Sequence, residues 1–404
     1  MDTRRRSLAA ISAAIAITAS FYAAAPACAA DPGITDSEIV VGMFAPMSGP
    51  LVAFGLDPLQ AARMIYEDIN KKGGIHGRKI RVVAEDDKCN PIEAVGVAKK
   101  LVTVDKVFLI NGGSCTPAAV AIQEFMTREK VPFVMLNAAG DGGVFPPTRY
   151  VFGSFGGTQR SVGATIMEFA IKELKGKRIA FISHDDDFGN SNTATAKAVA
   201  ERSGAQIVAL ERISPRVTDV TPTLLNVRQA KPDVIISTAY PGPGVLIAQK
   251  YGEFKMTNIP LVQAVQGIPV PAAFHKNVGN DAVFANFYYG SPLNDLTEGP
   301  KQQKWLQQYK QAYPDRTPSA FMAYGIPSAL MTIAALDKAG RNVTRESFID
   351  ALETMQMETD VMAGPVGFAN GRRDAGRASV FVKFDGKAHS LMPGVYSWNG
   401  KDGM

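Results

Sequence analysis

Short apolar runs alternate with amphipathic stretches along most of this chain. The first run, Ile39 to Phe44, is rich in β-branched residues and has no polar face, which is typical of a strand buried on both faces of a parallel sheet. Apolar residues then recur at helical spacing from Leu59 to Ile69, and Gly73-Gly74 ends the predicted helix. A second strand is predicted from Lys79 to Ala84. Together these segments predict a βαβ unit.

The loop between the first strand and this helix, residues 45–55, is rich in glycine, proline and serine. It leaves the carboxyl end of the strand, the edge at which open α/β sheets bind their ligands. Asp57 is predicted to cap the helix and Pro58 to occupy its first position, where a missing N–H has no cost. We therefore expect part of a binding site in this loop.

The same alternation continues through the rest of the chain. Asn90-Pro91 and Thr116-Pro117 each predict a cap followed by a proline at the first helical position. A long helix is predicted over residues 319–339, and the tail from Ser379 to Trp398 alternates like a strand. Further strands are predicted at residues 107–111, 131–136, 150–155, 178–183, 206–212, 234–238, 259–264 and 283–288. Two similar sets of segments predict paired, doubly wound α/β domains, with the chain crossing between them more than once.

Length and composition agree with this organisation. The 404 residues are too many for one ordinary core, and 46% hydrophobic with 20% charged residues is typical of a soluble globular protein. The net charge of +5 falls to +3 without the three arginines and one aspartate of residues 1–30. So mild and evenly spread a charge argues against nucleic acid or a membrane surface as a partner.

Residues 1–30 are predicted to be a secretory signal peptide. Three arginines at residues 4–6 form the charged region, Leu8 to Ala25 is apolar, and small residues crowd the segment from Ala27 to Ala30. Cleavage is expected near Ala29 or Ala30, which places the mature protein in the periplasm.

This leader has three alternative interpretations. A membrane anchor is disfavoured because the apolar core is rich in alanine, is interrupted by serine and threonine, and ends without a charged stop. A lipid-modified Cys28 remains open, although Ala25-Pro26-Ala27 is a poor lipobox, and Arg5-Arg6 lacks a clear twin-arginine consensus. No later segment has the roughly 18–20 uninterrupted apolar residues that a membrane span needs.

Export makes the cysteines informative. Cleavage removes Cys28 and leaves Cys89 and Cys115, and one even pair in an oxidising compartment predicts a disulfide. Two free thiols or a metal-binding pair are the alternatives. Four scattered histidines provide no cluster with metal-ligand spacing, so neither a metal nor another cofactor is expected.

Candidate catalytic groups are few. The chain has no phosphate-binding loop and no nucleophile elbow, since the run from Gly112 to Thr116 lacks the final glycine. His184 beside Asp185, Asp186 and Asp187 could form an acid–base cluster, but no nucleophile or metal motif accompanies it. A solvated acidic loop is the favoured interpretation, and the protein is predicted not to be an enzyme.

What remains are strand-end loops rich in small residues, hydroxyl groups and backbone amides. The helix start at Thr116-Pro117 combines a hydroxyl with the positive end of a helix, which suits an anion such as a carboxylate. Ala138-Ala139-Gly140 allows a ligand to approach the main chain closely. From these residues alone, an ordinary cap and an ordinary turn remain open as alternatives.

Three motifs resemble the start of a known protein family. They are A-P-M-S-G-P-L-V-A-F-G after the first strand, E-D-I-N-K-K-G-G-I-H-G-R at the end of the first helix, and D-D-K-C-N-P. In this order and spacing they resemble the leucine/isoleucine/valine-binding proteins, the periplasmic solute-binding family that feeds ABC importers, and the resemblance continues to about residue 397. It implies a type I periplasmic binding fold of two lobes joined by three crossovers and closing on ligand by a hinge. The lobes are expected at residues 31–156 with 290–363, and at residues 157–289 with 364–404.

The resemblance also implies ligand-binding residues. In the family, the ligand carboxylate is held beside the second cysteine and by a Pro-Ala-Ala-Thr turn. The matching positions here, together with the family's aromatic positions, are Phe54, Ser114, Thr116, Ala138, Ala139, Gly140, Phe188 and Tyr240. Tyr324, in the long helix, is a weaker match.

One position departs from the family pattern. Where the amino-acid binders carry an acidic residue for the ligand's ammonium group, this chain has Gln266. A buried ammonium without a countercharge is costly, and a neutral amide cannot supply one. Where this chain has Phe188 the family often has tyrosine, so a second polar partner is absent. The sequence therefore favours an aromatic or apolar carboxylic acid without an α-ammonium, and a hydrophobic amino acid remains the alternative.

The resemblance implies partners as well. The expected partners are the small carboxylate solute and an ABC permease complex in the inner membrane, with the binding protein itself a monomer. A ligand-sensing subunit for chemotaxis or regulation would have the same fold, and the sequence does not separate the two roles.

Overall fold

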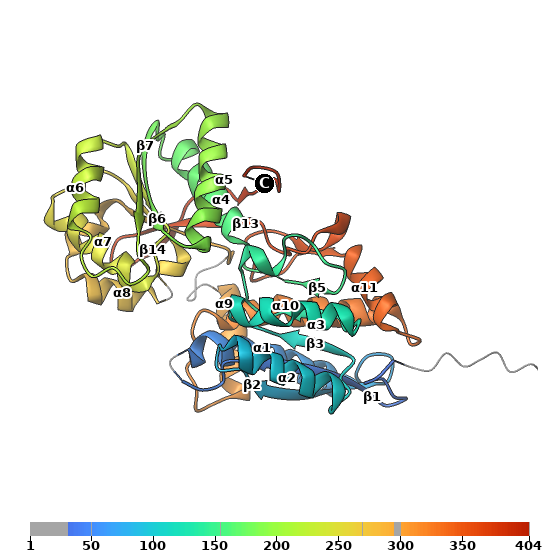
Figure 1. Ribbon diagram of the computed structural model, residues 1–404. Coiled ribbons are helices and arrows are strands. Elements are labelled where there is room, and N and C mark those ends of the chain that lie inside the picture. Colours follow the sequence, from blue (N-terminus) through green and yellow to red (C-terminus); the bar gives the residue numbers. More distant parts are fainter. Residues whose placement is uncertain (1–30, 50, 154, 269, 295–299, 404) are drawn as a thin grey trace, which may run out of the picture. The chain divides into compact units, whose positions relative to one another are not determined.

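The computed structural model of the protein describes residues 31–49, 51–153, 155–268, 270–294 and 300–403 (Figure 1). The predicted signal peptide, residues 1–30, lies outside the described residues. None of the described helices is long and apolar enough to cross a membrane.

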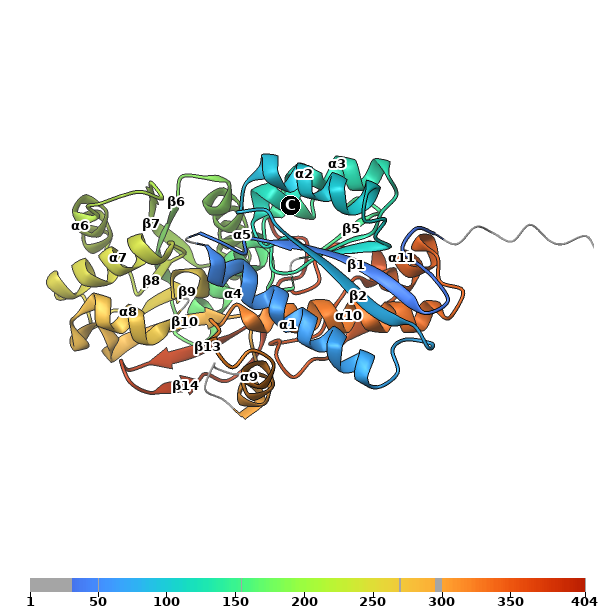
Figure 2. The same cartoon turned by 90° about the horizontal axis from the view of Figure 1, so that it is seen from below.

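Among the described residues, five parallel strands form a first sheet in the order β2-β1-β3-β4-β5. Its elements are β1 (Glu38–Ala45), α1 (Val52–Lys71), β2 (Lys79–Asp86), α2 (Pro91–Thr103), β3 (Leu109–Gly112), α3 (Thr116–Arg128), β4 (Phe133–Met135) and β5 (Val151–Phe152). A later helix, α10 (Met322–Ala339), packs against α1. Helices α1 and α10 lie on one face of this sheet and α2 and α3 on the other (Figure 2). Successive side chains of β1 enter opposite clusters, because Val41 and Met43 pack with α1 and α10 whereas Val40 and Phe44 pack with α2 and α3. The apolar run of β1 is therefore buried on both faces, as predicted.

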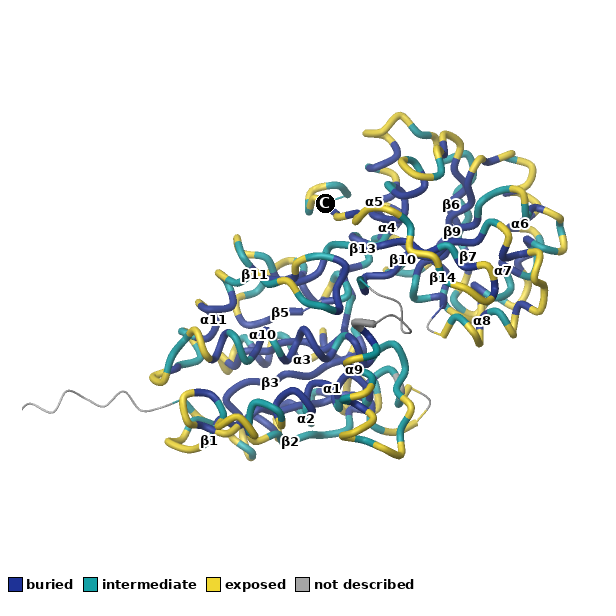
Figure 3. Tube along the Cα trace, turned by 180° about the vertical axis from the view of Figure 1, so that it is seen from behind, coloured by how far each residue is buried: buried dark blue, intermediate teal, exposed yellow. Residues whose placement is uncertain are grey.

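The second sheet has the order β14-β13-β10-β9-β8-β6-β7 in the described chain, with β15 beside β13. Its strands are β6 (Arg178–His184), β7 (Gln206–Ile213), β8 (Val234–Ser237), β9 (Leu261–Ala264), β10 (Phe287–Ser291), β13 (Ala378–Phe384), β14 (His389–Leu391) and β15 (Tyr396–Ser397). Its helices are α4 (Gln159–Lys172), α5 (Asp187–Ser203), α6 (Thr221–Ala230), α7 (Pro241–Glu253) and α8 (Pro271–Val278). The strands from β10 to β7 are parallel, whereas β13 and β14 are antiparallel to their neighbours. Strand residues are mostly buried in both sheets (Figure 3).

The chain passes between the two sheets three times along its described segments. It leaves the first sheet after β5, and it returns after β10, because Leu293, Trp305 and Tyr309 pack in the cluster of α1. The return segment contains α9 (Pro300–Ala312), α10, α11 (Arg345–Glu353) and the paired strands β11 (Gln356–Met357) and β12 (Val366–Gly367). Phe368 and Ala375 still pack in that cluster, so we propose a third boundary after Ala375 rather than at residues 363/364.

The predicted start of the first helix was wrong. Helix α1 begins at Val52, and Pro58 lies inside it. Pro58 has no N–H for the carbonyl of Phe54, four residues earlier, and that carbonyl instead accepts a hydrogen bond from Asn137 Nδ2 at 3.1 Å. The Asp57 side chain does not cap the helix, because it accepts hydrogen bonds from Arg316 and Ser319.

Two smaller predictions also need correction. The predicted strand at residues 283–288 begins as a 3₁₀ helix, η3 (Asp281–Asn286), because Asn280 caps it by accepting from the Ala282 N–H at 3.1 Å, and β10 follows. In α3 the cap position belongs to Cys115, and Thr116 is the first helical residue. The hydroxyl of Thr116 is engaged elsewhere, with Gly140.

Candidate functional site

The carboxyl ends of β1, β3 and β4 are neighbours at one edge of the first sheet, because these strands are adjacent and parallel. The segment after β1 carries Phe54, the segment after β3 carries Ser114 and Thr116, and the turn after β4 carries the residues from Ala138 to Gly140. The structure thus places the predicted residues of this sheet at a single edge. Their role in binding stays a prediction.

Thr116 and Gly140 are in direct contact. The hydroxyl of Thr116 accepts a hydrogen bond from the Gly140 N–H at 3.0 Å, so its own proton remains available to donate to an anion. A Cβ on Gly140 would lie 1.8 Å from the Cγ2 of Thr116, so the turn can approach the start of α3 only with glycine here. The pair fixes the turn against the positive end of a helix.

Two buried polar side chains follow β3 and β4 at the same edge. Gly112 and Met135 are partners in the β3–β4 register, and Ser114 and Asn137 each follow two residues later. Ser114 is 1% and Asn137 7% exposed. Among the described residues, neither Ser114 Oγ nor Asn137 Oδ1 has a hydrogen-bond partner. Such groups are costly to bury alone, and a bound solute is one way to satisfy them.

An aromatic pair borders this edge. The rings of Phe54 and Phe321 meet edge to face with centroids 4.8 Å apart, and Tyr324 lies 6.3 Å from Phe321. The segment before Phe321 is held by Asp57, which accepts from Arg316 Nη2 at 2.9 Å and from the Ser319 N–H at 2.7 Å. Phe321 was missed from the sequence, because nothing near it in the chain signals a contact with Phe54.

The disulfide lies directly beside the start of α3. Cys89 and Cys115 are bonded with their Cα atoms 5.5 Å apart, which agrees with the prediction. The bond ties the residue before Thr116 to the segment after β2. It therefore holds the amino end of α3 in place next to Gly140.

A buried carboxyl group lies close to the disulfide. Asp87 is fully buried, its Oδ1 accepts from the Cys89 N–H at 3.1 Å, and its Oδ2 has no partner among the described residues. Burial, with a smaller contribution from the charge of Asp86, raises the pKa of Asp87 from 3.8 to about 6. Ionised Asp87 is thus an unfavourable group in the folded protein at neutral pH.

Asp87→Asn is expected to raise the free energy of unfolding at pH 8 by about 1–2 kcal/mol and to change it little at pH 4. Because its pKa is higher in the folded state, Asp87 contributes most stability below pH 3.8, and this contribution is lost as the pH rises through 6. Urea unfolding at both pH values checks this. An equal gain at both would point to packing instead of ionisation.

The second sheet presents a similar edge. Strands β6, β8 and β9 are adjacent and parallel, and the segments after them carry Phe188, Tyr240 and Gln266 respectively. The structure therefore brings these three predicted residues to one edge of the second sheet.

Both ring nitrogens of His184 are hydrogen-bonded at this edge, so neither is free for acid–base chemistry. Its Nε2 accepts from the Tyr240 N–H at 2.8 Å, and its Nδ1 donates to the carbonyl of Ile213 at 3.2 Å. Burial lowers the pKa of His184, which keeps the ring neutral. The rings of His184 and Tyr240 stack with centroids 4.2 Å apart. These contacts support a structural role for His184.

Asp186, predicted to lie in a solvated loop, instead makes two side-chain contacts. It is half-buried at the start of α5, where its Oδ1 accepts from the Gly189 N–H at 2.9 Å. Its Oδ2 accepts from the Tyr240 hydroxyl at 3.2 Å. The acidic run was visible in the sequence, but the contact with Tyr240 was not, because the two residues follow different strands.

Gln266 lies in the 3₁₀ turn η2 (Val265–Gly267) directly after β9. Its Oε1 is buried and has no partner among the described residues. A small cavity beside it is lined by side chains from α4, β9 and β13, including Thr165 and Ser379. No described residue lining that cavity is acidic or basic.

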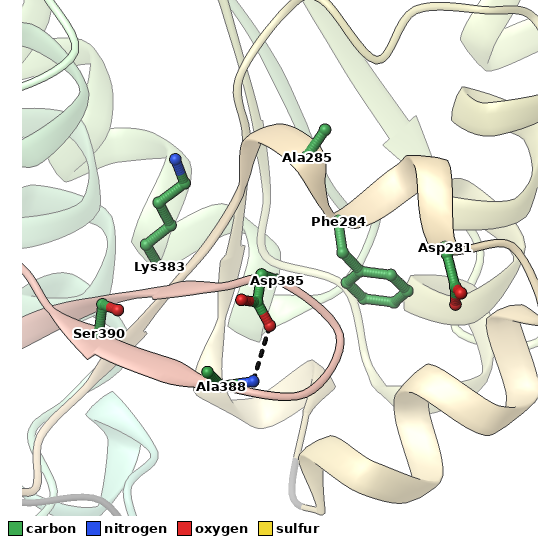
Figure 4. Close-up of a pocket in the computed structure, with 7 residues that line it drawn as sticks. All are labelled: Asp281, Phe284, Ala285, Lys383, Asp385, Ala388 and Ser390. Atoms are coloured by element: carbon green, nitrogen blue, oxygen red, sulfur yellow. Dashed lines mark hydrogen bonds between the residues drawn. The ribbon is translucent and has the colours of Figure 1, made fainter.

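A separate pocket, whose lining residues are drawn in Figure 4, lies near the amino end of β10 in the second sheet. Lys383, which lines this pocket, pairs with Tyr288 near the amino end of β10, away from the carboxyl ends of the strands that precede Tyr240 and Gln266. The other residues that line the pocket are Asp281, Phe284, Ala285, Asp385, Ala388 and Ser390. The pocket is thus no part of the candidate site.

No group of three or more histidine, cysteine, aspartate or glutamate side chains among the described residues could hold a metal ion.

The model of a protein family described as "Periplasmic binding protein" matches residues 38–388, most of the chain. The chain belongs to the periplasmic binding protein family. A curated relative of this periplasmic binding protein is Leu/Ile/Val-binding protein homolog 7 of Brucella abortus, which is 25% identical over 375 residues and is matched over 88% of each chain.

Solved structures of binding proteins share this fold. One, from Rhodopseudomonas palustris BisB5 in complex with 3,4-dihydroxy benzoic acid, has a TM-score of 0.72 at 22% identity, with 89% of this chain and 97% of that chain covered. Another, LivJ from Streptococcus pneumoniae in complex with isoleucine, has a TM-score of 0.69 at 22% identity, with 88% and 99% covered. At this identity the likeness establishes the type I periplasmic binding fold and leaves the solute open.

Proposed function

We propose that this protein binds a small carboxylic acid in the periplasm and delivers it to an ABC importer. The family match supports the role of an exported solute-binding protein. The amino end of α3, with the hydroxyls of Ser114 and Thr116, supplies donors suited to a carboxylate. No catalytic step is proposed, because His184 already uses both ring nitrogens.

The proposed solute is an aromatic or apolar acid without an α-ammonium group. The observation that carries this proposal is Gln266, a buried neutral amide in the turn directly after β9. An ammonium there would lose its water without gaining a countercharge. The rings of Phe54, Phe188, Tyr240 and Phe321 suit an apolar or aromatic body.

A hydrophobic amino acid is the second candidate. The Brucella relative is named for leucine, isoleucine and valine, and LivJ was solved with isoleucine. Asp186 supplies a carboxylate at the same edge as Gln266, two strands away, and an ammonium that reached it would find a countercharge. A sensing subunit with the same solute is a further role, which neighbouring permease genes would argue against.

Mass spectrometry of the solute that co-purifies with the mature protein is the first test. Calorimetry should then show an aromatic acid such as benzoate binding with a Kd of about 1 μM or tighter, corresponding to about −8 kcal/mol, and leucine binding weakly or not at all. Gln266→Glu should weaken benzoate at least tenfold, because it adds a negative charge beside the acid's apolar end. The same change should improve leucine binding.

Gln206→Glu is the matched control, since it adds the same charge at an exposed position on the amino end of β7. It should leave both affinities unchanged. Tight leucine binding by the wild type, unaffected by Gln266→Glu, would contradict the proposed solute class and favour Asp186 as the partner of an ammonium.

A further inference from the structure

Tyr240 is held more firmly than an aromatic side chain that only packs against a ligand. Its N–H donates to His184 Nε2 at 2.8 Å, and its ring stacks on His184 at 4.2 Å. The carbonyl of Ala239, the preceding residue, accepts from the buried Gln263 Nε2 at 3.0 Å. Both the main chain and the ring of Tyr240 are therefore fixed before any solute arrives.

Asp186 fixes the polarity of the Tyr240 hydroxyl. A carboxylate only accepts hydrogen bonds, so the hydroxyl must donate its proton to Asp186 Oδ2, 3.2 Å away. Burial, together with the charge of Asp186, raises the pKa of Tyr240, which keeps that proton in place. The lone pairs of the tyrosine oxygen are then what it offers to a solute, and they can only accept.

An aromatic surface surrounds this acceptor. The ring of Phe188 lies 5.0 Å from the ring of Tyr240, at 43° to it. Phe188 belongs to the first turn of α5, whose amino end is capped by the same Asp186. The edge of the second sheet therefore combines two rings with a hydrogen-bond acceptor next to a fixed negative charge.

We propose that the solute is an aromatic acid with a ring hydroxyl, which donates a hydrogen bond to the oxygen of Tyr240. This inference rests on the proposed function, because it assumes that the carboxylate of the acid binds at α3. Tyr240 is then a residue that determines specificity, and Asp186 positions its proton. The charge of Asp186 also disfavours a second carboxylate at that end, so an aromatic dicarboxylate should be rejected.

Calorimetry with 4-hydroxybenzoate, benzoate and benzene-1,4-dicarboxylate tests the inference. The wild type should bind 4-hydroxybenzoate about tenfold tighter than benzoate, because only the ring hydroxyl donates to the Tyr240 oxygen, and the dicarboxylate should bind weakest. Tyr240→Phe should weaken 4-hydroxybenzoate about tenfold, leave benzoate within twofold and remove the preference between them.

Asp186→Asn tests the positioning role. Asparagine still caps α5, but its amide can donate to the Tyr240 oxygen and free the tyrosine proton, so the preference for the hydroxylated acid should shrink and the dicarboxylate should bind more tightly. Asp185→Asn is the matched control, because it removes the same charge from an exposed neighbour and should leave all three affinities unchanged.

The outcomes separate this inference from the proposed function. If benzoate binds as tightly as 4-hydroxybenzoate, or Tyr240→Phe weakens both equally, the inference fails while the proposal of an aromatic acid stands. If none of the three acids binds and leucine does, both fail. A loss of the preference in Tyr240→Phe with unchanged thermal stability would support the inference.

Discussion

Replacing Asp57 with alanine is expected to lower the free energy of unfolding by about 3 kcal/mol. Asp57 is 1% exposed and accepts from Arg316 Nη2 at 2.9 Å and from the N–H and the hydroxyl of Ser319 at 2.7 Å each. Alanine removes the carboxylate to which the Ser319 N–H and the Arg316 guanidinium donate. Arg316 can still reach water, which keeps the expected loss below the larger values for fully buried ion pairs.

Urea unfolding of the purified protein measures this loss. Asp68→Ala is the control on the same helix, because the ion pairs of Asp68 with Lys71 and Lys72 are exposed, and the change should alter the free energy of unfolding by less than about 0.5 kcal/mol. Asp57→Ala should also weaken solute binding, since Asp57 holds the segment that places Phe321 in contact with Phe54. Equal stabilities of the two variants would show that the Asp57 contacts contribute nothing.

Removing the disulfide with the double substitution Cys89→Ala and Cys115→Ala is expected to cost about 3.5 kcal/mol, the chain-entropy estimate for a loop of this length. The bond joins residues 26 positions apart and holds the amino end of α3, so solute affinity should fall as well. Unfolding of the wild type with and without a reductant should reproduce the difference.

Thiol titration of the unfolded, unreduced mature protein provides the control. It should detect no free cysteine. Two reactive thiols, or a double variant as stable as the wild type, would contradict this account of the disulfide.

The parts of the fold that could be predicted are those with local causes. The β-branched run of β1 and the cap-and-proline pair Asn90-Pro91 specify their elements within a few residues, and the structure has both. The candidate residues could be assigned to sheet edges because adjacent parallel strands place their carboxyl ends together.

The missed features depend on contacts between distant residues. Asp57 and Pro58 looked like the start of a helix, but Asp57 bonds to Arg316 and Ser319, 259 and 262 positions away. The contact between Asp186 and Tyr240 spans 54 positions and depends on the adjacency of β6 and β8. No periodicity or capping motif encodes such pairs, because each residue by itself fits an ordinary local role in the sequence.

Pro58 and Asn137 together determine how the carbonyl of Phe54 is hydrogen-bonded, which has a consequence for sequence evolution and for loop grafting. The carbonyl of Phe54 is open to the amide of Asn137, 83 positions away, because Pro58 donates nothing to it. In a homologue with an ordinary residue at position 58, a helical N–H would compete for that carbonyl, and an amide at position 137 would lose its anchor. The two positions should therefore be exchanged together in evolution, and a biosensor built by transplanting one of these loops must carry the other with it.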